Sequence, residues 1–126
     1  MFKMIKAVNK NKAIEILKRG LPLGFPTDTL PAIGCLPEFS EIIYKFKKRD
    51  KNKALILMGS DLSQVINYVH KSTIDDFLYL TEKFWPGPLT LVVPIARGKK
   101  LFSLSKINTL GIRIPRSIIA KSLISE

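Results

Sequence analysis

Hydroxyl, carboxylate and cationic side chains occur at three places in this chain where a ligand could bind. The first is the run Thr27, Asp28 and Thr29, which directly follows an apolar stretch with the pattern of a strand. Hydroxyl groups and exposed backbone N–H groups at a strand end can bind a small polar ligand. Taken alone, however, the tripeptide favours a turn whose side chains bond to neighbouring backbone groups.

The second place holds two cations. Lys47 and Arg49 stand one residue apart just beyond a predicted helix. In an extended segment both side chains point to the same side, where they could converge on one polyphosphate. Arginine offers a bidentate fork to phosphate oxygens, and lysine offers a mobile point charge. The alternative is a solvated basic helix end that faces the helix dipole.

The third place is a cation within an apolar strand. Arg113 alternates with Ile112 and Ile114, so its side chain points away from the face that those two share. A cation on a central strand needs an acidic partner or an anionic ligand. Thr109 lies four residues earlier on the same strand face as Arg113.

A rigid turn, Trp85-Pro-Gly-Pro88, precedes another predicted strand. The prolines stop the preceding helix, and we expect Phe84 and Trp85 to pack into the core. Thr90, just after this turn, can face a ligand.

The elements that must position these groups follow from the apolar pattern. We predict strands at 21–26, 54–58, 90–95 and 110–114. We predict helices from Asn9 or Asn11 through Arg19, from Ser40 to the basic cluster, over 62–69, from 72 toward Lys83, and over 117–124. This mixture favours an α/β or α+β fold, with a twisted, mixed and partly parallel open sheet and flanking helices.

Two of the predicted helices come with details that a structure can test. In the helix opened by Ser40, we expect Ile42, Ile43 and Phe46 to form one apolar stripe. The run from Ser72 to Asp75 resembles a capping box at the start of the helix toward Lys83.

Composition sets the broad class. A chain of 126 residues suits a single domain. The net charge of +11 should attract phosphates, although solvated lysines in a biased composition explain it equally well. The lone Cys35 and lone His70 argue against a disulfide framework or a structural zinc site, and we expect Cys35 to be a small buried residue. We expect no membrane association and a cytoplasmic location, because there is no long apolar run and no secretion signal.

Four motifs, in this order, resemble the YrdC family of threonylcarbamoyl-AMP synthases. They are Pro26-Thr-Asp-Thr29, Lys47-Lys-Arg49 with Ala54-Leu-Ile-Leu57, Phe84-Trp-Pro-Gly-Pro-Leu-Thr90, and Gly111-Ile-Arg-Ile-Pro115. The match covers nearly the whole chain. The motifs are jointly specific, because unrelated proteins rarely contain all four in sequence.

The resemblance implies a twisted α/β fold with a basic cavity. It also implies the reaction of L-threonine, bicarbonate or CO2 and ATP to give threonylcarbamoyl-AMP and pyrophosphate, after which other proteins transfer the group to tRNA. The implied ATP-binding residues are Lys47, Arg49, Thr109 and Thr90, and the implied threonine-binding residues are Thr27, Arg113 and Lys53. Magnesium would accompany ATP, held largely by its phosphates and water. No protein nucleophile is expected, because positioning and charge neutralisation supply most of the catalysis in phosphoryl-group chemistry.

The chain departs from the family pattern at two points. Pro31 stands where the family often has an aromatic residue. The family continues with a strand and a Ser-x-Asn segment that helps to hold the nucleotide, and nothing after Arg113 matches it. We therefore expect one YrdC-like domain over residues 1–126, with its C-terminal strand and Ser-x-Asn segment missing.

Three functions stay open on the sequence alone. The first is an ATP-using synthase for tRNA modification. The second is a non-catalytic nucleotide- or RNA-binding remnant of the same fold, and the third is an inactive fragment. We expect any RNA binding to be weak and strongly dependent on salt, because the chain lacks interleaved surface aromatics and any known RNA-binding motif.

Overall fold

The computed structural model describes residues 7–48, 50, 53–96 and 109–125. The helices are α1 (Lys10–Lys18), α2 (Glu41–Lys47), α3 (Leu62–Val65), α4 (Ile74–Phe84) and α5 (Ile118–Ile124). The strands are β1 (Leu23–Phe25), β2 (Ala32–Gly34), β3 (Ile56–Met58), β4 (Leu91–Pro94) and β5 (Thr109–Arg113). Short 3-10 helices are η1 (Pro37–Phe39), η2 (Ile66–Tyr68) and η3 (Lys71–Thr73). The predicted site residue Arg49 lies outside the described residues.

The described strands form two sheets. β1 and β2 make an antiparallel hairpin in which Leu23 pairs with Gly34. The second sheet has the order β3-β5-β4, with β3 parallel to β5 and β4 antiparallel to it. The predicted α/β class with a mixed, partly parallel sheet is thus confirmed, although the strands divide between two sheets.

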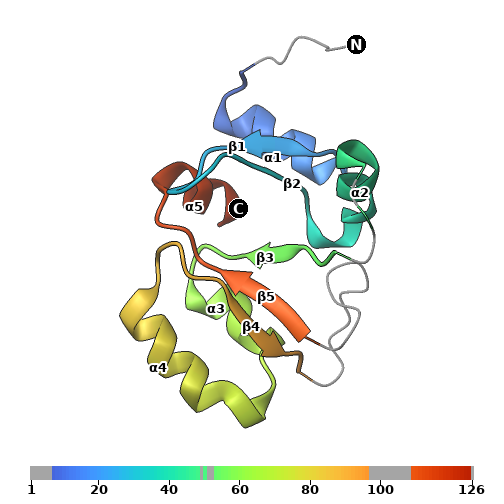
Figure 1. Ribbon diagram of the computed structural model, residues 1–126. Helices are drawn as coiled ribbons and strands as arrows, with labels where there is room; N and C mark the ends of the chain where they lie inside the picture. The colour runs from blue at the N-terminus through green and yellow to red at the C-terminus, as the bar shows by residue number, and fades with distance from the viewer. Residues whose placement is uncertain (1–6, 49, 51–52, 97–108, 126) are drawn as a thin grey trace.

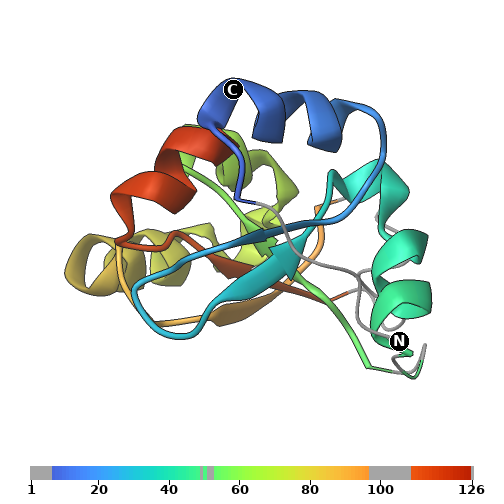
Figure 2. The ribbon, with the colours of Figure 1, turned by 90° about the horizontal axis from the view of Figure 1, so that it is seen from above.

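Different helices lie beside each of the two sheets (Figure 1). The β1–β2 hairpin lies with α1 and α2 at one end of the molecule, and the three-stranded sheet lies with α3 and α4 at the other. α5 follows β5 back toward the hairpin and contacts α1, and the two helices lie near each other in the view from above (Figure 2). The chain therefore brings the turn after β1 close to the end of β5.

The main core lies between the three-stranded sheet and the helices α3 and α4. Leu110 and Ile112 of β5 and Val65 of α3 have almost no exposed surface. Burying a side chain of this size contributes about 1.5–3 kcal/mol. Phe77 of α4 joins this core and meets Trp85 edge to face, with ring centroids 5.4 Å apart. β5 is therefore the best-anchored strand, and the residue at its end is held in place.

Three of the described helices begin at a residue whose side chain accepts a hydrogen bond from the first turn. Asn9 accepts a hydrogen bond from the backbone N–H of Lys12 and starts α1. Asp61 accepts one from the backbone N–H of Gln64 and starts α3. Ser117 caps α5 in the same way. Each such cap contributes about 1 kcal/mol.

Several details differ from the sequence-based predictions. Strand β2 was not predicted, because its three residues show no alternation long enough to read. Phe46 does not join an apolar stripe with Ile43, because it is 62% exposed while Tyr44 is buried in its place. Ser72 does not start a capping box, because its hydroxyl lies 2.8 Å from His70 Nδ1 and the helix begins two residues later.

Two predictions about burial, one for Phe84 and Trp85 and one for Cys35, are only partly right. Trp85 packs against the core as expected, whereas Phe84 is half exposed. Cys35 is only partly buried.

Within the described residues, none of the helices has both the length and the apolar character needed to cross a membrane.

Candidate ligand site at the end of strand β5

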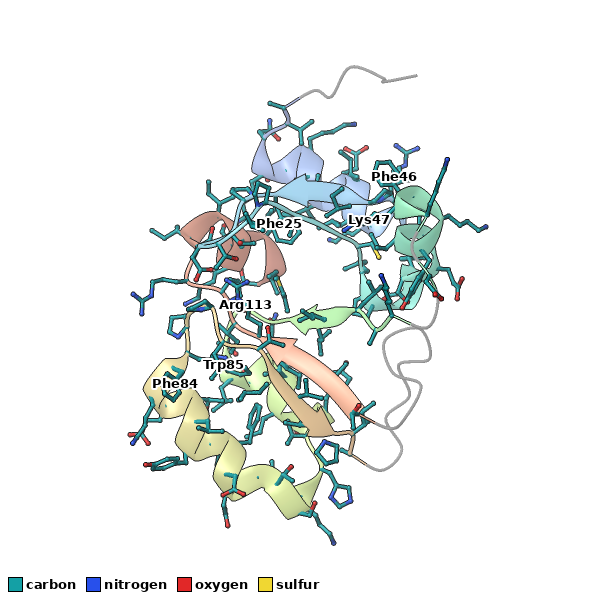
Figure 3. The ribbon with its side chains drawn as sticks, in the orientation of Figure 1. Phe25, Phe46, Lys47, Phe84, Trp85 and Arg113 are labelled. Carbon is teal, nitrogen blue, oxygen red and sulfur yellow. The ribbon has the colours of Figure 1, made fainter. Side chains whose placement is uncertain are left out.

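Arg113, the last residue of β5, is the centre of a polar cluster (Figure 3). Its guanidinium donates from Nη2 to Asp28 Oδ1 at 2.6 Å and from Nη1 to Thr29 Oγ1 at 3.1 Å. Its Nε donates to the backbone carbonyl of Gly87 at 2.9 Å. Arg113 is only 7% exposed, so this cation is neutralised and hydrogen-bonded inside the protein. The prediction was that this cation needs an acidic partner or an anionic ligand, and the structure shows the acidic partner, Asp28.

Three loops are joined at this point. Backbone hydrogen bonds connect Gly87 N–H to the carbonyl of Ile114 at 2.9 Å and Gly59 N–H to the carbonyl of Arg113 at 3.1 Å. The side chain of Arg113 adds the turn after β1, through Asp28 and Thr29. The cluster therefore depends on β5 for its placement, and the surrounding loops are fixed to that strand.

Asp28 lies on an exposed turn, but its side chain is only 17% exposed. Its Oδ1 accepts a second hydrogen bond from the backbone N–H of Arg116 at 3.0 Å. Partial burial raises the pKa of this carboxyl. Hydrogen bonds from its own backbone N–H and that of Arg116, together with the charge of Arg113, outweigh this effect and hold the pKa below its usual value of 3.8. Asp28 is therefore ionised at neutral pH.

The two threonines of the turn bond mainly to each other and to the backbone. Thr27 Oγ1 lies 2.7 Å from the carbonyl of Leu30, to which it donates, and accepts from the backbone N–H of Thr29 at 3.1 Å. The two hydroxyl oxygens are 3.2 Å apart. These contacts match the turn interpretation of the tripeptide, while Thr29 also reaches Arg113. Thr27 thus lies beside the cluster without touching the guanidinium.

The other two predicted nucleotide-binding residues, Thr109 and Thr90, lie farther along the three-stranded sheet. Thr109 begins β5 opposite Pro94, so at about 3.3 Å per residue it stands about 13 Å from Arg113. Thr90 lies between them, with its methyl group next to Gly111, where a Cβ would sit 3.5 Å away. Both threonines are partly buried. They lie along the face of the central strand β5 that Gly111 shares with Arg113, rather than at a single point.

Two lysines of the predicted site are described, Lys47 on the phosphate side and Lys53 on the threonine side, and neither has a described contact with Arg113. Lys47 is exposed at the end of α2, and Figure 3 draws it well separated from Arg113. Lys53 is also exposed, and its backbone carbonyl accepts a hydrogen bond from Tyr44 at 2.8 Å. The convergence of Lys47, Arg49 and Arg113 on one ligand stays a prediction.

Sequence reasoning missed some members of the cluster. The carbonyl of Gly87 and the backbone N–H of Arg116 carry no signal in their residue types, because any residue has these groups. The pairing of Asp28 with Arg113 did have a signal, since a cation in an apolar strand and a carboxylate at a strand end each need a partner.

The fold is α/β, and Arg113 and Asp28 form a charged, hydrogen-bonded site at the carboxyl end of its central strand β5. The chain belongs to the Sua5/YciO/YrdC family, whose description reads "Telomere recombination", because the family model matches residues 15–126. A threonylcarbamoyl-AMP synthase from Idiomarina loihiensis is 31% identical over 90% of this chain and 63% of its own length. One from Aliivibrio fischeri is 27% identical over 84% of this chain and 60% of its own length. The chain therefore spans about three-fifths of these relatives.

Solved structures give the same relationship. Sua5 from P. abyssi complexed with L-threonine superposes with a TM-score of 0.81 at 26% identity, over 95% of this chain and 37% of that one. YciO from E. coli gives a TM-score of 0.73 at 25% identity, over 92% of this chain and 57% of that one. The fold predicted from the motifs is thus that of these structures.

Proposed function

We propose that this chain forms threonylcarbamoyl-AMP from L-threonine, bicarbonate or CO2 and ATP, as a cytoplasmic step of tRNA modification. The names of the curated relatives and the motifs around Asp28 and Arg113 support this proposal. Downstream proteins would then transfer the threonylcarbamoyl group to tRNA.

The observation that carries the proposal is the Arg113–Asp28 pair. A guanidinium has five N–H groups, and the three contacts described above use three of them. The remaining two can receive the carboxylate of an amino acid. Asp28 supplies a negative charge next to that cation, which suits the ammonium group of the same amino acid. A zwitterion such as L-threonine therefore matches the charges of this pair, as the L-threonine complex of a family member supports.

ATP would lie along the face of β5 that carries Thr109 and meets Thr90, with its phosphates toward Lys47 and Arg49. Lys53 stays a further candidate for the threonine side, as the family resemblance implies, and Thr27 would contact threonine directly. Magnesium would accompany ATP, held largely by its phosphates and water, because the described residues include no group of three or more His, Cys, Asp or Glu that could hold a metal ion.

In this reaction the main task of the protein is to position threonine and ATP. A carbamate oxygen of threonine attacks the α-phosphorus of ATP, the bond to the bridging oxygen breaks, and pyrophosphate leaves. Arg113 would hold the threonine carboxylate, and Lys47 and Arg49 would neutralise the phosphates. No side chain needs to form a covalent bond, because alignment and charge neutralisation supply the rate enhancement in such transfers.

Product analysis tests the proposal. The purified protein is incubated with ATP, bicarbonate, L-threonine and magnesium, and the mixture is examined by mass spectrometry. We expect threonylcarbamoyl-AMP that disappears when L-threonine is left out and when Arg113 is changed to Ala. The matched control is Arg116→Ala, which removes an exposed arginine side chain but keeps the backbone N–H that bonds Asp28. Absence of the product from the wild-type protein would count against the synthase.

The strong positive charge supports a second candidate, a nucleotide- or RNA-binding protein without catalysis. Salt separates the two, because a protein that neutralises several RNA phosphates loses affinity steeply as salt rises. We expect tRNA binding to be weak and to vanish at physiological salt, while binding of an ATP analogue persists. Salt-resistant RNA binding without ATP binding would favour the second candidate.

A further inference from the structure

Trp85, the only tryptophan of the chain, directly follows α4 at the end of that helix nearer to Arg113 (Figure 3). Its ring packs against the main core and meets Phe77 edge to face. Its indole N–H has a partner as well, because Nε1 donates to the backbone carbonyl of Leu89 at 2.8 Å. A phenylalanine ring could supply much of the same packing but could not make this bond. The indole N–H therefore distinguishes tryptophan from other aromatic residues at this position.

The indole hydrogen bond joins the two ends of the turn from Trp85 to Leu89. The start of this turn is fixed on α4, because the backbone N–H of Trp85 donates to the carbonyl of Thr81 at 3.0 Å. The end of the turn is fixed to the side chain of Trp85 by the bond to Leu89. The two prolines inside the turn have a restricted φ, so Gly87 between them is the residue whose backbone can adjust most. The two fixed ends therefore determine where Gly87 lies.

Gly87 connects this turn to the candidate ligand site. It is buried, and its N–H donates to the carbonyl of Ile114 at 2.9 Å. Its carbonyl accepts a hydrogen bond from Arg113 Nε, also at 2.9 Å. A Cβ on this residue would lie 2.9 Å from the carbonyl oxygen of Phe84, so glycine is required for the turn as it stands. A displaced turn would therefore release Nε and change the orientation of the guanidinium.

We propose that Trp85 is a positioning residue of the threonine-binding site. Its indole N–H holds the carbonyl of Leu89, and the closed turn holds the carbonyl of Gly87 on Arg113 Nε. The guanidinium is thereby kept in the orientation that receives the carboxylate of the amino acid. The effect on the amino acid rests on the proposed function, whereas the effect on Arg113 does not. Trp85 acts through Gly87 and needs no contact with the ligand itself.

Trp85→Phe separates positioning from core packing, because phenylalanine keeps an aromatic ring but has no N–H donor. The 15N NMR signal of Arg113 Nε–H, assigned by its absence in Arg113→Lys, reports on the bond to Gly87. We expect exchange of this proton with water to speed up about tenfold in Trp85→Phe. The matched control is Phe77→Leu, which removes the ring partner of Trp85 and leaves the indole N–H in place. Phe77→Leu should lower the midpoint of urea unfolding without changing this exchange.

Binding of L-threonine gives the functional readout. We expect Trp85→Phe to weaken it by about threefold to tenfold, the effect of one hydrogen bond, and Phe77→Leu to change it by less than about twofold. Wild-type affinity in Trp85→Phe would overturn the proposal. If the wild-type protein does not bind L-threonine, the proposed function fails. The exchange of Arg113 Nε–H is measured without any ligand, so it still decides whether Trp85 positions the guanidinium.

Gly87→Ala keeps the proposal testable even if Trp85→Phe does not fold. The added Cβ would displace the turn, so both the indole N–H and Arg113 Nε–H should exchange faster. The indole signal is unambiguous, since the chain has one tryptophan. Gly24→Ala is the control and should leave both signals unchanged, because its Cβ would lie 3.9 Å from the nearest atom. Faster exchange at only one of the two N–H groups, or equal exchange of Arg113 Nε–H in Trp85→Phe and the wild type, would overturn the proposal.

Discussion

The guanidinium of Arg113 lies 2.6 Å from the carboxylate of Asp28 and joins the end of β5 to the turn after β1. The two residues are far apart in the sequence, and the contact is nearly closed to solvent. It links the hairpin to the three-stranded sheet, so the same pair that suits a zwitterionic ligand also holds the two sheets together.

Removal of this cation should destabilise the protein. Arg113→Ala should lower the free energy of unfolding by about 2–3 kcal/mol, because it removes charge-assisted hydrogen bonds and leaves Asp28 without its cation. Urea denaturation measures this loss. Arg116→Ala should cost less than about 0.5 kcal/mol, since its exposed side chain has only a 3.4 Å contact with the carbonyl of Pro86. Similar losses for both variants would contradict the account.

The lowered pKa of Asp28 predicts a pH dependence of stability. A carboxyl with a folded-state pKa below 3.8 contributes stability above that value and loses it as the pH falls through the folded-state pKa. The stability difference between the wild type and Asp28→Asn should therefore stay constant between about pH 8 and pH 5 and shrink below about pH 4. Thermal unfolding over this range measures the difference. A difference that grows on acidification would show that the sign is wrong.

Cys35 should react slowly with thiol reagents. Partial burial raises the pKa of its thiol, and the negative charge of Glu38 raises it further, so little thiolate forms at neutral pH. We expect the native protein to react with a disulfide reagent more slowly than the urea-unfolded protein, and Glu38→Gln to speed the native reaction. A native thiol that reacts as fast as free cysteine at neutral pH would refute this assignment.

Gly20 should resist substitution. Its φ of +79° is a left-handed conformation, and a Cβ there would lie 2.9 Å from Phe39 Cδ1. Gly20→Ala should cost about 1–2 kcal/mol of stability. Gly24→Ala serves as the control, because the nearest atom to its Cβ would be the carbonyl oxygen of Ala32 at 3.9 Å. Equal stability of the two variants in urea unfolding would argue against this reason.

The sequence predicted most of the elements because their signals are local. Asn9 caps its helix through its own side chain, and the apolar runs at β3, β4 and β5 reflect burial in one core. The predictions that were wrong failed because of tertiary contacts. His70 takes the hydroxyl of Ser72 away from a capping role, and Tyr44 occupies the buried position expected of Phe46.

The candidate site also combines features that the local sequence predicts with features that tertiary contacts decide. Arg113 could be singled out from its alternation with Ile112 and Ile114, and its need for an anion follows from burial. The identity of Asp28 as its partner, and the contribution of the Gly87 carbonyl, come from the meeting of distant loops. Local sequence patterns contain no information on that meeting.

Binding of L-threonine at Arg113 tests the central claim most directly. Titration of the 15N-labelled protein with L-threonine, followed by NMR, reports on the Arg113 side-chain N–H and on the backbone of Asp28, Thr29 and Gly87. We predict shifts concentrated on these groups, and binding at least tenfold weaker for Arg113→Lys, which keeps the charge but loses the guanidinium fork. Shifts elsewhere in the protein, or no response to L-threonine, would contradict the account.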